Sequence, residues 1–200
     1  MISTVKPKLS KLINAIAKPF VRINPNILSL LGLIPPIFFI IFMIQKMYIP
    51  ALFMFAGLFL DTIDGAVARM TGKSSSFGGF LDSSLDRVSD ALFIWAFALS
   101  GIVSYELVII AMFLSLFISY LRSRAELAGN GKITLAVGII ERPERLIFLF
   151  FALLLNSIWP DTKLIAGMNI AEIVFSVLVF LSVITIFQRL AMAYNKLKTS

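Results

Sequence analysis

The chain has 200 residues, of which 59% are hydrophobic and only 14% are charged. Soluble domains average about 45–50% hydrophobic and about 25% charged residues, so this composition favours lipid as the main solvent. Because a helix needs about 20 mostly apolar residues to cross a bilayer, the length allows about six or seven spans and leaves little room for a soluble domain. With neither cysteine nor histidine present, thiolate metal sites are excluded and carboxylates become the leading candidates for a general base.

Basic and apolar residues are mixed at near-helical spacing in residues 1–22. This pattern predicts an amphipathic juxtamembrane helix that lies on the membrane surface, followed by a membrane domain over residues 23–200. A cleaved signal peptide is the alternative, but its hydrophobic core and small-residue cleavage site are missing.

Six long apolar stretches follow, at about 27–45, 48–69, 79–101, 105–128, 143–159 and 168–192. Each predicts a membrane-spanning helix. The expected fold is therefore an all-α integral membrane protein with six transmembrane helices and an N-terminal amphipathic surface helix. The pair Pro35–Pro36 lies inside the first stretch and predicts a bend, which membrane helices tolerate.

The positive charges are distributed asymmetrically between the predicted connections. If the N-terminus is cytoplasmic, all of the 18 lysines and arginines except Lys46 and Lys163 lie on the inside. This asymmetry predicts a multi-pass cell-membrane protein with both termini in the cytoplasm. It also accounts for the net charge of +7, so we expect no nucleic-acid partner.

Two aspartates interrupt the end of the second predicted span. Asp61 and Asp64 are three positions apart and share a helical face. Gly65 and Ala68 extend this face with almost no side-chain bulk. The pattern therefore predicts a pair of carboxylates beside a smooth backbone surface.

A second acidic stripe opens the third predicted span, where Gly78, Asp82 and Asp86 follow one another at four-residue intervals. Both stripes lie at cytoplasmic helix ends joined by a short polar loop, so the four carboxylates are predicted to converge near the membrane boundary. Crowded like charges are costly unless cations neutralise them, and oxygen-only ligands favour Mg²⁺, Mn²⁺ or Ca²⁺. Two such ions that share carboxylates form an arrangement used for phosphoryl displacement.

Two alternatives explain fewer of these features. Helix caps or exposed interfacial residues account for one or two aspartates, but not for four at helical spacing with interleaved glycines. A cation channel or carrier also places carboxylates inside the membrane. It does not require the small-residue face or the Arg69 that follows it.

The combined pattern, Asp61-x-x-Asp64-Gly65-x-x-Ala68-Arg69 and then Gly78-x-x-x-Asp82-x-x-x-Asp86, resembles the signature of the CDP-alcohol phosphotransferase family at every defined position. The resemblance covers nearly the whole chain and implies a homodimeric enzyme with two divalent cations, Mg²⁺ or Mn²⁺. It implies that Asp61, Asp64 and Asp82 hold the first ion, that Asp61, Asp82 and Asp86 approach the second, and that Asp86 is the catalytic base at a cytoplasmic active site. The residues expected to bind the CDP-lipid are Pro25, Asn26, Ile27, Gly65, Ala68, Arg69, Ser75 and Gly78.

Arginines gather at the cytoplasmic ends of the fourth and fifth predicted spans. Guanidinium groups bind phosphate in a bidentate fork, which favours a phosphorylated acceptor. The alternative is ordinary positive-inside placement with local pairs such as Arg122–Glu126. The runs 119–126 and 138–145 resemble the branch of phosphatidylinositol phosphate and archaetidylinositol phosphate synthases. This resemblance implies that the phosphate of inositol 1-phosphate is bound by Arg122, Arg124, Arg142, Arg145 and Arg189.

The predicted reaction transfers a diradylglycerol phosphate group from CDP-archaeol or CDP-diacylglycerol to inositol 1-phosphate and releases CMP. Glycerol 3-phosphate could use the same arginines and is the alternative acceptor. Serine would leave the arginines without a phosphate partner. A non-catalytic cation transporter is the alternative from a different class of protein.

Overall fold

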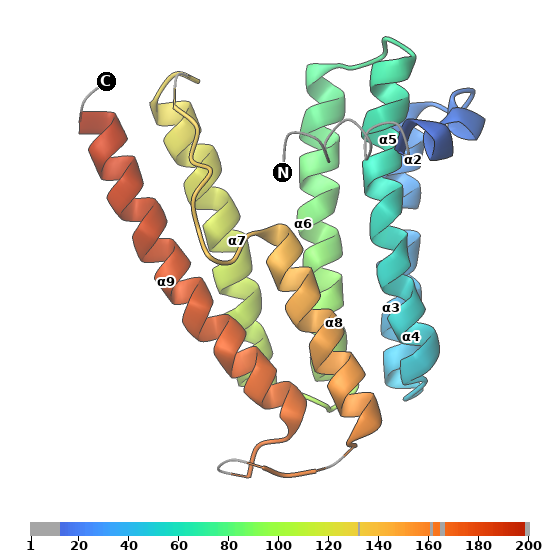
Figure 1. Cartoon of the computed structure of the whole chain (residues 1–200), viewed down its shortest axis with the longest axis vertical. Coiled ribbons are helices and arrows are strands. Elements are labelled where there is room, and N and C mark those ends of the chain that lie inside the picture. The colour runs from blue at the N-terminus through green and yellow to red at the C-terminus, as the bar shows by residue number, and fades with distance from the viewer. Residues whose placement is uncertain (1–12, 132, 161, 165–166, 199–200) are drawn as a thin grey trace.

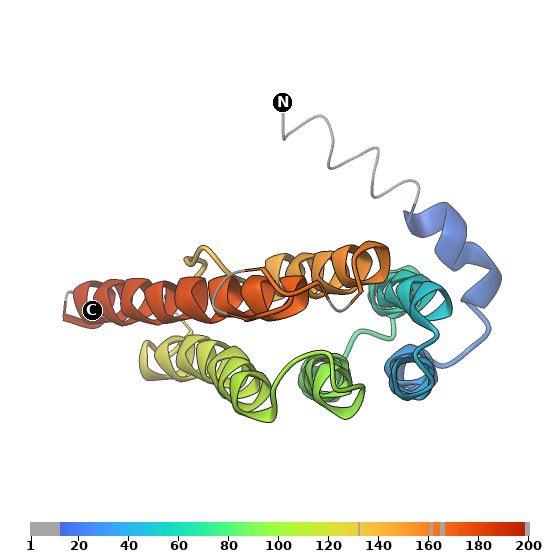
Figure 2. The same ribbon diagram turned by 90° about the horizontal axis from the view of Figure 1, so that it is seen from below.

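The computed structural model describes residues 13–131, 133–160, 162–164 and 167–198, with the side chains of residues 58–62 also outside the described set. Over these ranges the secondary structure is helical, apart from one isolated bridge between Lys163 and Asn169. The long helices stand side by side along the long axis of the molecule (Figure 1). Seen end-on, they form two layers: α9, α8 and α4–α5 in one, and α7, α6 and α2–α3 in the other (Figure 2).

The first predicted span is two helices, α2 (Pro25–Leu31) and α3 (Ile34–Ile44), separated at Gly32 and Leu33. Pro35 lies in the first turn of α3, where a missing backbone N–H costs no helical hydrogen bond. The helix is thus interrupted just before the proline pair, and the bend itself stays a prediction. The second predicted span is also interrupted, with α4 (Tyr48–Met54), the 3₁₀ turn η2 (Phe55–Gly57) and α5 (Leu58–Met70) in succession.

Gly57 allows this turn to pack directly on the proline ring of α3. A Cβ atom at Gly57 would lie 2.1 Å from Cγ of Pro35, which is far inside van der Waals contact. We therefore expect Gly57→Ala to lower the free energy of unfolding by about 1–3 kcal/mol, the usual cost of overpacking a core. Thermal unfolding in detergent, followed by tryptophan fluorescence, measures the effect.

Gly79→Ala is the matched control, because no atom lies within 4 Å of a Cβ at Gly79. Gly79 is inside α6, where alanine is favoured over glycine by about 1 kcal/mol. Its melting temperature should stay equal or rise. Equal melting temperatures for the two variants would show that the contact between η2 and Pro35 is not tight.

The remaining helices are α6 (Ser76–Leu99), α7 (Tyr105–Ala128), α8 (Arg142–Ile158) and α9 (Ile170–Lys198). Their limits agree with the predicted spans to within a few residues at most ends. Ser75 caps α6, since its hydroxyl accepts a hydrogen bond from the Gly78 amide at 3.0 Å. At its other end, α9 continues to Lys198, beyond the predicted limit at residue 192.

The described helices include three that are long and apolar enough to cross a membrane: Pro25–Ile44, Tyr105–Ala128 and Ile170–Lys198. Large apolar side chains are exposed on the outside of the bundle, as at Phe113, Phe180 and Phe187. These features confirm an all-helical membrane protein. Residues 1–12 of the predicted surface helix lie outside the described residues; residues 13–17 are helical and lead into η1 (Lys18–Phe20).

Aromatic side chains form the centre of the main core. Phe93 of α6 packs against Phe39 of α3 and Phe55 of η2, with ring centroids 4.8 Å and 5.0 Å away, respectively. Phe97 contacts Phe175 of α9 at 4.9 Å. This packing fixes α6 relative to its neighbours, and α6 carries Gly78, Asp82 and Asp86 of the predicted site.

The segment over residues 133–141 lies against α9 and delays the start of α8. Its backbone is bonded to α9 side chains: the Ile140 amide donates to Thr185 at 3.0 Å, and Arg189 Nε donates to the Val137 carbonyl at 2.9 Å. As a result, α8 begins well inside the bundle rather than at the end where α7 and α9 finish (Figure 1). The first turn of α8 therefore faces α6 at depth.

Candidate active site

The two acidic stripes lie on α5 and α6, which the short loop of residues 71–75 joins at one end of the bundle (Figure 1). Asp64 is buried, and its Oδ2 accepts a hydrogen bond from the hydroxyl of Ser29 on α2. Asp82 and Asp86 occupy successive turns of α6 and are partly buried. The side chain of Asp61 is outside the described residues.

A cavity of about 190 Å³ lies between α2, α5 and the start of α6, and we call it the glycine-lined cavity. Its lining includes every residue predicted to bind the CDP-lipid except Ile27, which is half exposed and lies outside it. It is lined by Pro25, Asn26, Ser29, Asp64, Gly65, Ala68, Arg69, Lys73, Ser74, Ser75, Gly78, Gly79 and Asp82. The structure therefore brings residues from three separate segments around one space.

Small residues keep this cavity open. A Cβ atom at Gly78 would lie 3.4 Å from Asn26 Oδ1 and 3.2 Å from Ser75 Oγ, closer than most real contacts. At Gly65 it would lie 3.4 Å from Nη1 of Arg69, in the space beside the guanidinium group. A flat, hydrogen-bonding ligand can thus approach the backbone here and meet the positive charge of Arg69.

The donor chemistry of the aspartates fits a hard divalent cation, because all the candidate ligands are carboxylate oxygens. Among the side chains that the structure describes, no group of three or more acidic residues is close enough to hold a metal ion. The side chain of Asp61, which like Asp82 is predicted to contact both ions, is not among those described. The convergence of four aspartates around two ions thus stays a prediction.

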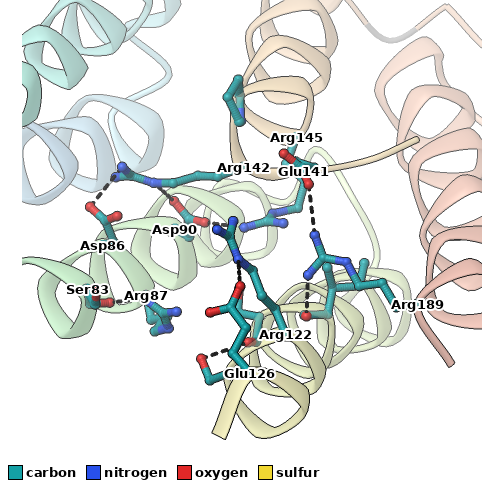
Figure 3. A pocket seen from close by; sticks show the side chains of 14 residues that line it. Ser83, Asp86, Arg87, Asp90, Arg122, Glu126, Glu141, Arg142, Arg145 and Arg189 are labelled. Carbon is teal, nitrogen blue, oxygen red and sulfur yellow. Dashed lines mark hydrogen bonds and ion pairs between the residues drawn. The ribbon is translucent and has the colours of Figure 1, made fainter. Parts of the chain in front are cut away.

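A second cavity, of about 390 Å³, lies beside α6 between α7, α8 and α9 (Figure 3). We call it the arginine-lined cavity. It is lined by Ser83, Asp86, Arg87, Asp90, Ile118, Ser119, Arg122, Ser123, Glu126, Glu141, Arg142, Pro143, Arg145 and Arg189. Of the arginines predicted to bind the acceptor, all but the exposed Arg124 line it.

The two cavities are close neighbours. A narrow space of about 20 Å³ shares Ser29 with the glycine-lined cavity and shares Asp86 and Arg142 with the arginine-lined cavity. The acidic stripe of α6 passes along both, with Asp82 in the first wall and Asp86 in the second. The two cavities therefore lie next to each other along α6, with Asp86 in the wall between them.

Carboxylates and guanidinium groups alternate along the wall of the arginine-lined cavity. Arg142 Nη1 lies 2.8 Å from Asp86 Oδ1, and Arg142 Nε lies 3.1 Å from Asp90 Oδ1. Arg145 Nη2 lies 2.7 Å from the other oxygen of Asp90. Figure 3 shows the resulting chain of charges, Asp86, Arg142, Asp90 and Arg145.

Asp90 was not among the residues predicted from the sequence, although a signal for it was present. It follows Asp86 by four positions and so continues the stripe of Asp82 and Asp86 along the same face of α6. Ser29, the partner of Asp64, was also missed. A serine in an apolar helix has no pattern that distinguishes it from an ordinary interior residue.

Arg189 is almost fully buried and has several protein partners. Its Nη1 donates to the Ile118 carbonyl at 2.6 Å, and its Nη2 lies 3.1 Å from Oε1 of Glu141. With the bond from Nε to Val137, these contacts join α7, α9 and the segment before α8. Arg189 lines the cavity, but these bonds give it an evident structural role as well.

A family model described as CDP-alcohol phosphatidyltransferase matches residues 22–188. The chain belongs to this family. It is 42% identical to an archaetidylinositol phosphate synthase of Pyrococcus horikoshii, over 83% of this chain and 89% of the relative. It is also 32% identical to a phosphatidylinositol phosphate synthase of Mycobacterium marinum, over 90% of this chain and 79% of that one.

Solved structures of the Mycobacterium tuberculosis phosphatidylinositol phosphate synthase share this fold. The structure with CDP-DAG bound superposes with a TM-score of 0.75 at 27% sequence identity, covering 92% of this chain and 94% of the other. The complex with manganese and citrate gives a TM-score of 0.71, covering 91% and 88%. The protein is therefore an enzyme of the CDP-alcohol phosphatidyltransferase class.

Proposed function

We propose that the protein transfers the diradylglycerol phosphate group of a CDP-lipid to a hydroxyl of inositol 1-phosphate and releases CMP. The observation that carries this proposal is the contact between the two cavities along α6. One cavity offers small residues, Arg69 and two aspartates, as a nucleotide diphosphate requires. The other offers arginines suited to a second phosphate. The relatives named as inositol phosphate synthases favour inositol 1-phosphate over glycerol 3-phosphate.

The CDP moiety is assigned to the glycine-lined cavity and the lipid chains to the apolar surface beside it. Next to α2 lies a cavity of about 250 Å³ whose lining is almost purely hydrophobic, with Leu28, Leu31 and Ile63 among its residues. Leu28 and Ile63 are close in sequence to Ser29 and Asp64 of the glycine-lined cavity. A lipid with its head group at the aspartates could therefore place a chain here without leaving apolar surroundings.

In the proposed reaction, the acceptor hydroxyl attacks the phosphorus atom that carries the lipid. The phosphorus–oxygen bond to CMP breaks, and Asp86 takes the proton of the hydroxyl. Divalent cations, when bound at the aspartates, offset the charge that develops on the diphosphate. The arginines of the second cavity hold the acceptor phosphate so that its hydroxyl lies near Asp86.

We further propose six membrane spans, with both termini and the active site on the cytoplasmic side. The helical segments α2–α3, α4–α5, α6, α7, α8 and α9 supply the six crossings. The positive-inside asymmetry of the sequence supports this orientation. Two divalent ions, Mg²⁺ or Mn²⁺, and a homodimer belong to the same proposal.

The test is CMP release by the purified protein. CDP-archaeol and CDP-diacylglycerol are each offered with inositol 1-phosphate, glycerol 3-phosphate, serine or unphosphorylated inositol, with Mg²⁺, with Mn²⁺ or with a chelator. We expect release with inositol 1-phosphate and loss of release on chelation. Equal rates with inositol 1-phosphate and with unphosphorylated inositol would contradict a binding site for the acceptor phosphate. A higher rate with glycerol 3-phosphate would mean that glycerol 3-phosphate is the acceptor.

A further inference from the structure

Asp90 is the most buried carboxylate among those that line the arginine-lined cavity. Its side chain is 6% exposed, against 20% for Asp86, 33% for Glu126 and 37% for Glu141. A carboxylate at this depth is costly unless positive charges or hydrogen-bond donors compensate it. The partners of Asp90 therefore determine what it does.

The two oxygens of Asp90 bind two different guanidinium groups. Oδ1 accepts from Arg142 Nε at 3.1 Å, and Oδ2 accepts from Arg145 Nη2 at 2.7 Å. Both arginines come from the first turn of α8, three positions apart on one face, whereas Asp90 comes from α6. One side chain thus ties both arginines to the helix that carries Asp86.

Asp90 is shared by two guanidinium groups, each of which has more N–H donors than one carboxylate oxygen can accept, and Arg142 Nη1 also contacts Asp86. Arg145 Nε is buried and, within the described part of the chain, has no hydrogen-bond partner. Arginine side chains lose considerable rotamer freedom when they bind a ligand, so fixing them in advance favours binding. Asp90 fixes both before an acceptor arrives.

We propose that Asp90 is a positioning residue that holds Arg142 and Arg145 side by side for the phosphate of the acceptor. The inference rests on the proposed function for the identity of the acceptor, inositol 1-phosphate. Asp90 touches neither substrate in this role and acts through the two arginines. Loss of its hold allows each guanidinium group to adopt several orientations, and the bidentate geometry that phosphate requires is lost.

The direction in which the acceptor KM changes distinguishes a positioning role of Asp90 from a purely electrostatic effect of its charge. Removal of a negative charge beside a phosphate site should, by Coulomb's law alone, lower the KM for a phosphorylated acceptor. Loss of positioning should raise it. Asp90→Asn changes the charge with little change in volume, so the direction of the shift in KM decides between the two effects.

The experiment measures CMP release by full-length Asp90→Asn in detergent, with CDP-lipid and inositol 1-phosphate varied separately. We expect the KM for inositol 1-phosphate to rise at least ten-fold and the KM for the CDP-lipid to stay within two-fold of wild type. Glu106→Gln is the matched comparison, because it removes one negative charge at an exposed position in the first turn of α7, outside the lining of both cavities. It should shift the acceptor KM by less than three-fold.

Asp90→Glu is the second variant, because it keeps the charge and displaces the carboxylate by one methylene. It should give an acceptor KM between those of wild type and Asp90→Asn, and it decides the question by itself if Asp90→Asn does not fold. An unchanged or lowered acceptor KM, or equal increases in both KM values, overturns the inference. If the wild-type protein releases no CMP with any phosphorylated acceptor, the proposed function and the inference are both wrong. If the wild-type protein is active and Asp90→Asn has the same acceptor KM, only the role of Asp90 is wrong.

Discussion

Asp86→Asn should abolish CMP release while CDP-lipid binding stays within about two-fold of wild type. An amide cannot accept the proton of the attacking hydroxyl, and a positioned general base contributes about 10²–10⁴-fold to a rate. Binding should persist because the glycine-lined cavity does not include Asp86 among its lining residues. The measurements are CMP release under saturating substrates and equilibrium binding of a radiolabelled CDP-lipid.

The control for this variant is Glu106→Gln, at an exposed carboxylate in the first turn of α7. It makes the same chemical change far from both cavities and should leave the rate at the wild-type value. Arg142 keeps its second partner, Asp90, when Asp86 loses its charge, so the wall of the arginine-lined cavity should remain in place. An Asp86→Asn protein that retains a tenth of the wild-type rate would remove the assignment of Asp86 as the base.

Much of the fold could be predicted from the sequence because its signals are local. Apolar stretches of about 20 residues give the long helices, and a proline pair marks the interruption of the first. The cavity shared by Gly65 and Gly78 was expected from the family resemblance, and the small residues explain why there is room for a ligand.

The contacts that organise the arginine-lined cavity could not be predicted in this way. Asp90 is 52 and 55 positions away from Arg142 and Arg145 in the sequence. The spacing of residues within one helix cannot predict contacts between residues so far apart in the chain. The depth at which α8 begins depends on hydrogen bonds between residues 133–141 and α9, which single helices do not reveal. The sequence instead predicted one set of arginines at the membrane surface, in which Arg124 was equivalent to the others.

Arg142→Ala should raise the KM for the phosphorylated acceptor by about 10- to 100-fold and leave the KM for the CDP-lipid nearly unchanged. The expected factor follows from the loss of a hydrogen bond to a charged group, worth about 1.5–3 kcal/mol. Arg142 lines the arginine-lined cavity beside Asp86, so its guanidinium group is well placed to bring a bound phosphate near the base. Initial rates of CMP release with each substrate varied in turn give both constants.

Arg69→Ala is the mirror variant, because Arg69 lines the glycine-lined cavity and is absent from the lining of the other. It should raise the KM for the CDP-lipid and leave that of the acceptor near the wild-type value. Opposite selectivity in the two variants means that the two phosphates bind in separate places on either side of the acidic stripe of α6. Equal effects of Arg142→Ala on both substrates would instead mean that one mixed site serves both, and the division of the cavities between donor and acceptor would be wrong.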